Sequence, residues 1–429
     1  MAYTETTNVS FFSKLGSSFS GMGMGLVLFL AGTALLWWNE GDFVATRNAL
    51  NETQAQTQIV GDAKNLGPSF SGKVVHVNGF ADTKQVLVDS AFGVSQTAIA
   101  LSREVEFYQW VERSEEKKQK KLGGGEEIVT TYFYDKEWVG SPVDSSSFRD
   151  PDARARKVNT QLIAVEDQTI HATDVTFGPC RLPEFMIRSI SGAHPFDVKM
   201  SDEARAEMKK SILSSHAHQL LRGSTSVAVH PASAPTAVSS AAAPEVIHQQ
   251  GSVIYVGRSP ASPSIGDVRV TFTAVYPADI SIIAKYNGNT FEKVYASNGK
   301  TVSRLSMGVV SADHMFGKAH SSNSTWTWVL RVVGIFLVIG GLKSIVAPLA
   351  VIAGVIPLLG DIVGAGTGIV CTLLGAAWSF VIIAIAWLRF RPLIGGVLIL
   401  AAVALVALLY IKGRAKKAAA PAAPAAPAE

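Results

Sequence analysis

The chain has 429 residues, of which 48% are hydrophobic and 17% are charged, and its formal net charge is +4. Soluble domains carry about 25% charged residues, so this deficit indicates a membrane protein, and the small net charge argues against a nucleic-acid-binding protein. The two cysteines, Cys180 and Cys371, are too few and too far apart in the sequence for a zinc ribbon, a redox pair or a disulfide framework.

The first apolar run covers residues 19–38 and contains no charged residue. A helix of this length, at about 1.5 Å per residue, spans a hydrocarbon core of about 30 Å. Trp37 and Trp38 end the run and suit the membrane interface. A cleaved signal peptide is the alternative, but Lys14 would be its only basic residue. We therefore predict transmembrane helix 1 at 19–38, after a cytoplasmic segment 1–18.

Residues 42–325 are predicted to form a large β-rich domain. Apolar and polar residues alternate at 105–112 and at 268–276, which is typical of strands with one buried face. Asn287-Gly288 and Asn298-Gly299 are favoured hairpin pairs, so the short strands around them are expected to form a meander.

Three stretches of this domain depart from the strand pattern. Residues 113–127 carry mixed charge and then three glycines, which favours a solvated hairpin tip whose charges nearly cancel. A helix is predicted at 202–220, with Ser201 as its N-cap. The small-residue, proline-containing stretch 224–245 is predicted to be a flexible insert.

The C-terminal part contains three further uncharged or nearly uncharged runs. They predict transmembrane helices 2, 3 and 4 at 326–343, 362–387 and 393–411. Residues 345–359 contain two prolines and are short for a full span, so they are predicted to form an interfacial segment. The Ala/Pro tail 415–429 is predicted to be disordered.

The distribution of basic residues predicts the sidedness. Four spans place both termini on one side of the membrane. Lysines and arginines near the ends of the spans favour a cytoplasmic location for the termini, so residues 42–325 would be periplasmic in a bacterium or lumenal in a eukaryote. The predicted membrane-interface residues are Trp37, Trp38, Trp326, Trp328, Arg331, Arg389 and Arg391.

Glycines recur at intervals of four residues in two of the predicted spans. Small residues at this spacing let helix backbones approach closely. Such contacts would join either helices of one chain or two copies of the chain. The predicted helix-packing residues are Gly21, Gly25, Gly360, Gly364 and Gly368.

A search for catalytic or metal-binding patterns predicts neither. The nine histidines do not pair at the spacing of helical zinc sites, and no GxSxG motif occurs. The chain is therefore predicted to be no enzyme and to use no cofactor, no metal and no catalytic residue.

Ordered sequence blocks resemble one family of membrane proteins. The blocks are SFFSKLGSSF and LLWWNEG near the N-terminus, GKVVHVNG at 72–79, AFGVS at 91–95, VEFYQWVE at 105–112, TTYFYDKEW at 130–138, DSSSFR at 144–149, GDVRVTF at 266–272, SADHMF at 311–316, IPLLG at 356–360 and WLRFRPLIG at 387–395. In this order they resemble the LUMA (transmembrane protein forty-three) family over roughly residues 10–400.

This resemblance implies an α+β membrane protein with four transmembrane helices and one large domain between the first and second. Animal members are located in the endoplasmic reticulum and the inner nuclear membrane, where they are regarded as organisers that self-associate and hold partner proteins. The insert 224–245 and the tail look bacterial in style, which predicts a bacterial inner membrane here. The expected partners are the lipid bilayer, a second copy of the chain and unknown membrane or envelope proteins, with no nucleic acid.

Three functions compete at this stage. The first is a membrane scaffold that oligomerises and holds partner proteins. The second is an envelope sensor or binding module, whose β-rich domain captures a lipid, glycan or peptide. The third is an envelope enzyme or transporter. An apolar pocket in the β-rich domain would favour the second, and a convergent polar constellation there would favour the third.

Overall fold

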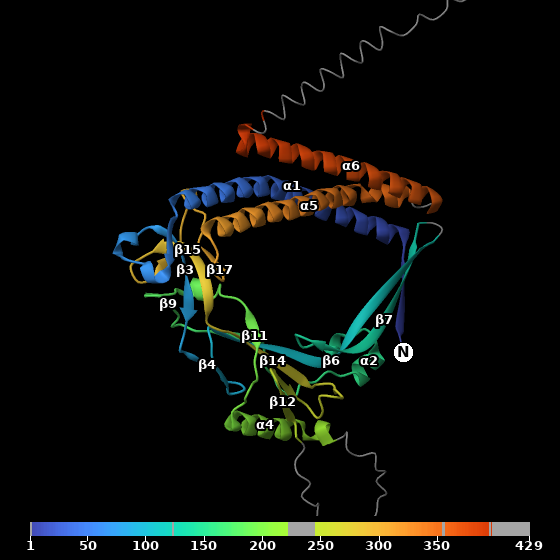
Figure 1. Ribbon diagram of the computed structural model, residues 1–429. Helices are drawn as coiled ribbons and strands as arrows, with labels where there is room; N and C mark the ends of the chain where they lie inside the picture. The colour runs from blue at the N-terminus through green and yellow to red at the C-terminus, as the bar shows by residue number, and fades with distance from the viewer. Residues whose placement is uncertain (1, 122–123, 222–244, 354–356, 394–395, 397–429) are drawn as a thin grey trace, which may run out of the picture. The chain divides into compact units, whose positions relative to one another are not determined.

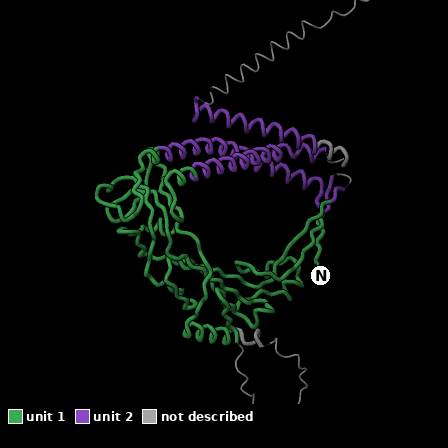
Figure 2. Tube along the Cα trace, in the orientation of Figure 1, with its two compact units in different colours: residues 1–7, 52–118, 128–317 green, residues 8–51, 119–127, 318–429 purple. Residues whose placement is uncertain are grey.

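The structure is a computed structural model that describes residues 2–121, 124–221, 245–353, 357–393 and 396 (Figure 1). It divides into two compact units (Figure 2). The β-rich unit contains residues 1–7, 52–118 and 128–317, and the helical unit contains residues 8–51, 119–127 and 318–429. The helices are α1 (Phe11–Gln56), α2 (Pro151–Arg156), α3 (Glu184–Ile187), α4 (Asp202–Leu221), α5 (Ala312–Ala353) and α6 (Pro357–Phe390).

Two main sheets build the β-rich unit. The strands are β1 (Tyr3–Val9), β2 (Gln58–Asp62), β3 (Val74–Asp82), β4 (Val86–Asp89), β5 (Val94–Thr97), β6 (Ala100–Lys120), β7 (Glu126–Val139), β8 (Gln168–His171), β9 (Thr176–Phe177), β10 (Cys180–Arg181), β11 (Ala193–Pro195), β12 (Ile247–Gln250), β13 (Val253–Val256), β14 (Val268–Val275), β15 (Ala278–Tyr286), β16 (Phe291–Glu292) and β17 (Arg304–Met307). One sheet has the order β1-β7-β6-β14-β13-β12, with β8 beside β6 and β11 beside β14. The other has the order β10-β9-β3-β15-β16, with β17 beside β15 and β2 beside β3, and β4 pairs with β5 alone.

The predicted alternation in β14 and β6 is confirmed. In β14, Val268, Val270 and Phe272 are fully buried while the residues between them are half-buried. The first half of β6 alternates in the same way, and its second half, which leads to the hairpin tip, is exposed. One face of the sheet therefore contributes to the apolar core, and the charged end of β6 does not.

Strand β1 places the N-terminal residues in the eight-stranded sheet. It is the terminal strand of the order, beside β7. Two hydrogen-bonded strands must lie in the same compartment, because a bilayer cannot separate them. The pairing places residues 3–9 beside a strand of the eight-stranded sheet, and the cytoplasmic location of segment 1–18 stays a prediction.

Helix α1 continues well beyond the predicted span 19–38. It runs without interruption from Phe11 to Gln56, through the polar stretch Asn39–Asp42. Its length, at about 1.5 Å per residue, exceeds a hydrocarbon core of about 30 Å. Residues 42–56, which we predicted as the beginning of the β-rich domain, are therefore helical.

The C-terminal helices are also longer than predicted. Helix α5 begins at Ala312 and passes through Pro348 to Ala353, so most of the predicted interfacial segment 345–359 continues this helix. Helix α6 begins at Pro357. Among the described residues, α1, α5 and α6 contain stretches long and apolar enough to cross a membrane.

The predicted helix at 202–220 is confirmed. Helix α4 covers it, and the hydroxyl of Ser201 accepts a hydrogen bond from the backbone N–H of Ala204. Cys180 and Cys371 are free and buried, and they belong to different units. Three predicted segments lie almost wholly outside the described residues: the insert 224–245, transmembrane helix 4 at 393–411 and the tail 415–429.

Glycines bring α1 and α5 into close contact. A Cβ atom on Gly341 would lie 2.5 Å from the backbone nitrogen of Phe29 and 2.7 Å from the carbonyl oxygen of Gly25. A Cβ atom on Gly32 would lie 2.9 Å from the backbone nitrogen of Val338. The two helix backbones approach too closely here for any side chain, as expected for small-residue contacts in membrane helices.

We expect Gly341→Ala to destabilise the protein by about 1–3 kcal/mol, because the new methyl group overlaps the backbone of α1. Gly340→Ala is the matched control, since no heavy atom lies within 4 Å of the corresponding Cβ position. Both substitutions change helix propensity equally, so the difference in thermal melting temperature in detergent isolates the packing effect. Equal melting temperatures for the two variants would contradict the close α1–α5 contact.

Candidate functional site

A buried carboxylate lies in α1 just after the predicted span. The side chain of Glu40 is 0% exposed. Its Oε1 accepts a hydrogen bond from Nε of Arg331 in α5 at 2.6 Å, and its Oε2 accepts one from Nη2 of the same residue at 2.9 Å. The indole Nε1 of Trp387 in α6 also donates to Oε2, at 2.9 Å. One carboxylate thus joins three helices by a bidentate ion pair and a third hydrogen bond.

A second arginine approaches the same carboxylate. Nη2 of Arg391 lies 3.6 Å from Oε2 of Glu40. The guanidinium carbon of Arg391 lies 4.3 Å from the ring centroid of Phe43 and 5.4 Å from that of Trp387. Such cation–π contacts are stronger where the cation is shielded from water. We call this site the Glu40 cluster; its members are Glu40, Arg331, Trp387 and Arg391.

Two asparagine side chains reinforce the contact between α1 and α5. Nδ2 of Asn39 donates to the carbonyl oxygen of Thr327 at 3.1 Å, and Nδ2 of Asn323 donates to the carbonyl oxygen of Phe43 at 3.1 Å. Each amide reaches the backbone of the opposite helix. These bonds and the Glu40 cluster explain how α1 continues as a helix through the polar residues that resemble a helix end.

The Glu40 cluster is suited to cross-linking the helices. A charge buried among apolar helices costs several kcal/mol unless it is paired, and removal of one partner leaves the other uncompensated. Oε1 of Glu40 accepts a hydrogen bond from Arg331 of α5, and Oε2 accepts from Arg331 and from Trp387 of α6. Arg331 supplies the counter-charge from α5 and Trp387 adds a hydrogen bond from α6, so this carboxylate constrains the relative depth and rotation of the three helices.

The predicted helix-packing glycines occupy different environments. Gly25 packs on α5, where its Cβ position would lie 2.7 Å from Cβ of Ser344. At Gly21, Gly364 and Gly368, no heavy atom lies within 4 Å of the Cβ position. The side-chain environment of position 360 lies outside the described residues. The packing role of the α6 glycines therefore stays a prediction.

The predicted interface arginines also differ from one another. Arg331 is buried in the Glu40 cluster, and Arg391 is half-buried beside it. Arg389 is exposed and lies over the ring of Phe390, with 5.7 Å between its guanidinium carbon and the ring centroid. Two of the three arginines thus bind an internal carboxylate, which the prediction of interfacial anchoring did not include.

The four predicted interface tryptophans keep exposed surface. Trp37, Trp38, Trp326 and Trp328 are all exposed among the described side chains. The ring of Trp37 lies 5.5 Å from that of Phe390, and the ring of Trp328 lies 4.7 Å from the guanidinium carbon of Arg331. Exposure suits the interfacial role, which stays a prediction.

Glu40 and Trp387 are the members of the cluster that sequence reasoning missed. The sequence contains a pattern that could have identified Glu40. One carboxylate follows the first predicted span by two residues, and arginines occur near the ends of two other predicted spans. An acidic residue and two arginines at corresponding ends of antiparallel helices predict an ion pair at one depth. The pairing of Trp387 requires the rotation of α6, which the sequence pattern does not specify.

The β-rich unit contains a separate groove of about 500 Å³. Trp138 and Tyr255 line it with their rings 6.0 Å apart, and the guanidinium carbon of Arg269 lies 4.6 Å from the ring centroid of Trp138. Pro260 and Pro263 complete its apolar lining. We call this site the Trp138 groove; it combines aromatic surface with the guanidinium of Arg269, which forms an ion pair with Glu106 at 2.7 Å.

Burial under the Trp138 groove affects two ionisable groups. The hydroxyl of Tyr255 donates a hydrogen bond to the carboxylate of Asp267 at 2.5 Å. Burial raises the pKa of Asp267, and burial and this hydrogen bond together raise the pKa of Tyr255. The backbone N–H of Ser264 also donates to Asp267, so the carboxylate organises the loop that carries the two prolines.

We expect Glu40→Leu to destabilise the protein by about 3–5 kcal/mol, because it leaves the buried guanidinium of Arg331 without its counter-charge. The double variant Glu40→Leu/Arg331→Met should recover part of this loss. The melting temperatures of both variants in detergent, monitored by tryptophan fluorescence, measure these changes in stability. Glu52→Gln is the control, since this α1 carboxylate is half-buried and binds Ser297 instead. If Glu40→Leu and Glu52→Gln melt at the same temperature as the parent, the cluster does not stabilise the helices.

Known proteins identify the family. The family described as Transmembrane protein 43 matches residues 107–392. The chain is 26% identical to Transmembrane protein 43 of Rattus norvegicus, over 96% of this chain and 94% of the relative, and 26% identical to that of Homo sapiens, over 95% and 94%. It is 25% identical to the Transmembrane protein 43 homolog of Drosophila melanogaster, over 88% and 90%. No solved structure matches the chain. The chain belongs to the Transmembrane protein 43 (LUMA) family of membrane proteins.

Proposed function

We propose that the protein is an integral membrane scaffold that self-associates and holds partner proteins through its β-rich unit. One observation carries this proposal: the buried charges of the helical unit are used to join helices within the chain. A helical unit closed in this way serves as an anchor. The β-rich unit is then the part with surface available to partners.

The edges and protruding strands of the β-rich unit support a binding role. Strand β1 and strand β12 end the eight-stranded sheet, so each has one backbone edge beside which no further strand is described. Such edges can pair with a strand from another chain. On β4, Val86 and Val88 expose 56% and 53% of their surface side by side along the strand. Edge pairing between copies and these exposed valines are two separate features that support self-association.

Affinity purification from native membranes tests the scaffold. We expect the full-length protein to co-purify with a reproducible set of membrane proteins, and to give particles of more than one chain in lipid nanodiscs when measured by native mass spectrometry. A chain that stays single at its native membrane concentration would exclude self-association. A preparation without any stoichiometric partner after cross-linking would exclude the holding of partner proteins.

A second candidate function is a binding module that captures a glycan or peptide, and the Trp138 groove favours it. Its two aromatic rings could stack on a sugar or a proline-rich peptide, beside Arg269, which Glu106 already pairs. Gln249 lines the groove and is exposed, so Gln249→Trp would fill it without disturbing the core. If Gln249→Trp no longer binds a small ligand that the parent binds, but still co-purifies with the same protein partners, the binding module is favoured over the scaffold.

The membrane in which the protein is located, and the side on which its termini lie, are part of the same proposal. Membership of the family gives an integral membrane protein, and a bacterial inner membrane, or the endoplasmic reticulum and inner nuclear membrane of a eukaryote, is the proposed site. For sidedness, the basic-residue distribution supports cytoplasmic termini, whereas the pairing of β1 with β7 supports an N-terminal strand in the compartment of the β-rich unit.

Single cysteines distinguish these two arrangements. In a variant lacking Cys180 and Cys371, we expect Thr6→Cys and Ser297→Cys to react alike with an impermeant thiol reagent in sealed cells, because β1 is part of the sheet of the β-rich unit. Ala420→Cys reports the C-terminal side. Reaction at position 297 but not at position 6 would contradict the strand pairing and restore the predicted cytoplasmic location of the N-terminal segment.

A further inference from the structure

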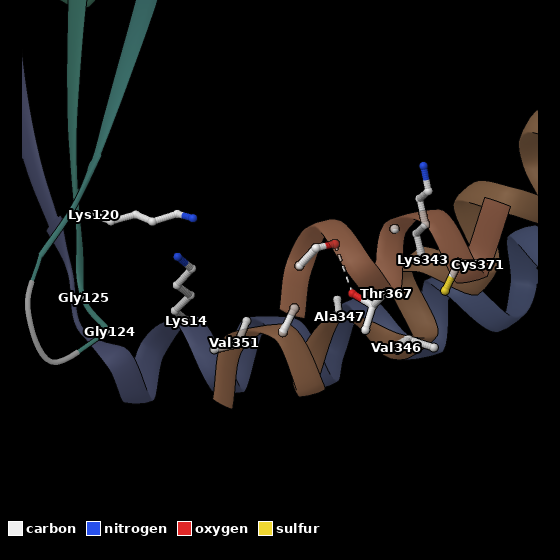
Figure 3. A pocket seen from close by; sticks show the side chains of 13 residues that line it. Lys14, Lys120, Gly124, Gly125, Lys343, Val346, Ala347, Val351, Thr367 and Cys371 are labelled. Carbon is white, nitrogen blue, oxygen red and sulfur yellow. Dashed lines mark hydrogen bonds between the residues drawn. The ribbon is translucent and has the colours of Figure 1, made fainter. Parts of the chain in front are cut away.

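The lysines that line a cavity of about 350 Å³ in the helical unit do not converge on one point. Lys14 and Lys120 extend toward each other at one end of the cavity, and Lys343 of α5 lies at the other end (Figure 3). Lys14 is paired with Glu126 at 3.0 Å, and Lys120 also has an interaction partner. An ionisable group with an unsatisfied ring nitrogen is found instead in the β-rich unit, on β3.

This group is the imidazole of His76, which is buried, with 2% of its surface exposed. Its Nε2 lies 2.8 Å from the carbonyl oxygen of Val310. Because a carbonyl oxygen only accepts, Nε2 carries the proton, and the neutral ring presents Nδ1 as an acceptor. Nδ1 is also buried, and it has no hydrogen-bond partner among the described residues. A second proton on this ring would therefore be a buried charge without an acceptor.

The backbone of Val310 is held on both of its polar groups. Its N–H donates to Oγ of Ser281 at 2.8 Å, and its carbonyl oxygen accepts from His76. The two side chains lie on the same face of the neighbouring strands β15 and β3. Val310 directly precedes Ser311, whose hydroxyl accepts a hydrogen bond from the N–H of His314 in the first turn of α5. We call His76, Ser281 and Val310 the Val310 clamp; it fixes the residue that leads into α5.

The environment of the clamp favours the neutral form of His76. Burial lowers the pKa of His76, and the hydrogen bond to Val310 and the charge of Asp313 oppose this only in part. The stabilisation from the neutral ring is therefore complete above the ordinary histidine pKa of about 6.5, and it is lost as the pH falls through the lowered pKa. The other charged or titratable groups on the same face of the sheet, or in the first turn of α5, are Asp62, Asp279, Lys285, Glu292, Arg304 and His314.

We propose that the Val310 clamp is a pH-sensitive latch: in mildly acidic solution His76 takes up a proton at Nδ1, gives up Val310 and frees the residues that lead into α5. The clamped conformation binds this proton more weakly than a conformation in which the ring reaches water, so acid shifts the population toward the open form. Histidine is the side chain whose charge ordinarily changes in this pH range. The latch needs no ligand, and it acts where the chain passes from the seven-stranded sheet into α5.

Hydrogen–deuterium exchange of the full-length protein in lipid nanodiscs tests the latch. The backbone amides of residues 304–316 are compared at about pH 7.5 and about pH 5.5, on either side of the ordinary histidine pKa, after correction for the pH dependence of chemical exchange. We expect about fivefold faster exchange at the lower pH, as follows from loss of one hydrogen bond of ordinary net strength. The amides of β14 should exchange equally at both pH values.

Three histidine variants locate the response. His76→Gln cannot titrate but keeps a side-chain N–H that can donate to Val310, so residues 304–316 should exchange equally at both pH values. His314→Gln and His171→Gln are the matched controls. His314 is exposed in the first turn of α5, and His171 also has a buried Nδ1 without a partner among the described residues, but neither belongs to the clamp. Both controls should keep the response to acid.

Asp313→Asn tests the same ring without changing it. Asp313 is exposed, and its charge raises the pKa of His76. Removal of this charge disfavours the imidazolium, so the midpoint of the acid response should move to lower pH. This variant decides the question if His76→Gln proves to be unfolded.

Three results would overturn the proposal. Equal exchange of residues 304–316 in the parent protein at both pH values would exclude a latch. A response that persists in folded His76→Gln, or that disappears in His314→Gln, would assign the titration to another group. An unchanged midpoint in Asp313→Asn would show that the ring of His76 is not the group that takes up the proton.

Discussion

A carboxylate buried among apolar helices has to be neutralised where it stands. Arg331 of α5 neutralises Glu40, with Arg391 a further 3.6 Å away, and Trp387 of α6 donates a hydrogen bond to the same carboxylate. The geometry of this ion pair is directional, because a bidentate guanidinium must lie in the plane of the carboxylate. Rotation or translation of α5 along α1 would break this geometry. The close glycine contacts of α1 with α5 depend on the same register, since a shift by one residue would place side chains against the opposite backbone.

The features that could be predicted from the sequence depend on local patterns. Alternation at 268–276 identified β14, because every second residue faces the core. The capping pattern at Ser201 identified α4, because the first turn of a helix needs an acceptor for its free N–H groups. The apolar runs identified three of the long helices for the same reason, because a bilayer requires about twenty apolar residues in succession, wherever the rest of the chain lies.

The features that could not be predicted depend on partners distant in sequence. Residues 39–42 look like a helix end because they are polar and include a glycine, yet α1 continues through them. What makes the continuation possible is Arg331, which is 291 positions away along the chain. The Glu40 cluster likewise depends on partners that are distant in the sequence. Arg331 and Arg391 were identified as interfacial residues, and only the fold shows that they share a carboxylate.

Glycine has two distinct uses in this helical unit, and spacing does not separate them. Gly25 and Gly341 face each other across α1 and α5, where a methyl group would overlap a backbone atom. Gly364 and Gly368 have the same interval of four residues, but their missing side chains leave space beside three lysines. In lipid, close packing and filled cavities are both favourable, because no hydrophobic driving force holds helices together. The interval of four residues therefore predicts a close helix contact only where a second backbone lies opposite, as α5 does for Gly25.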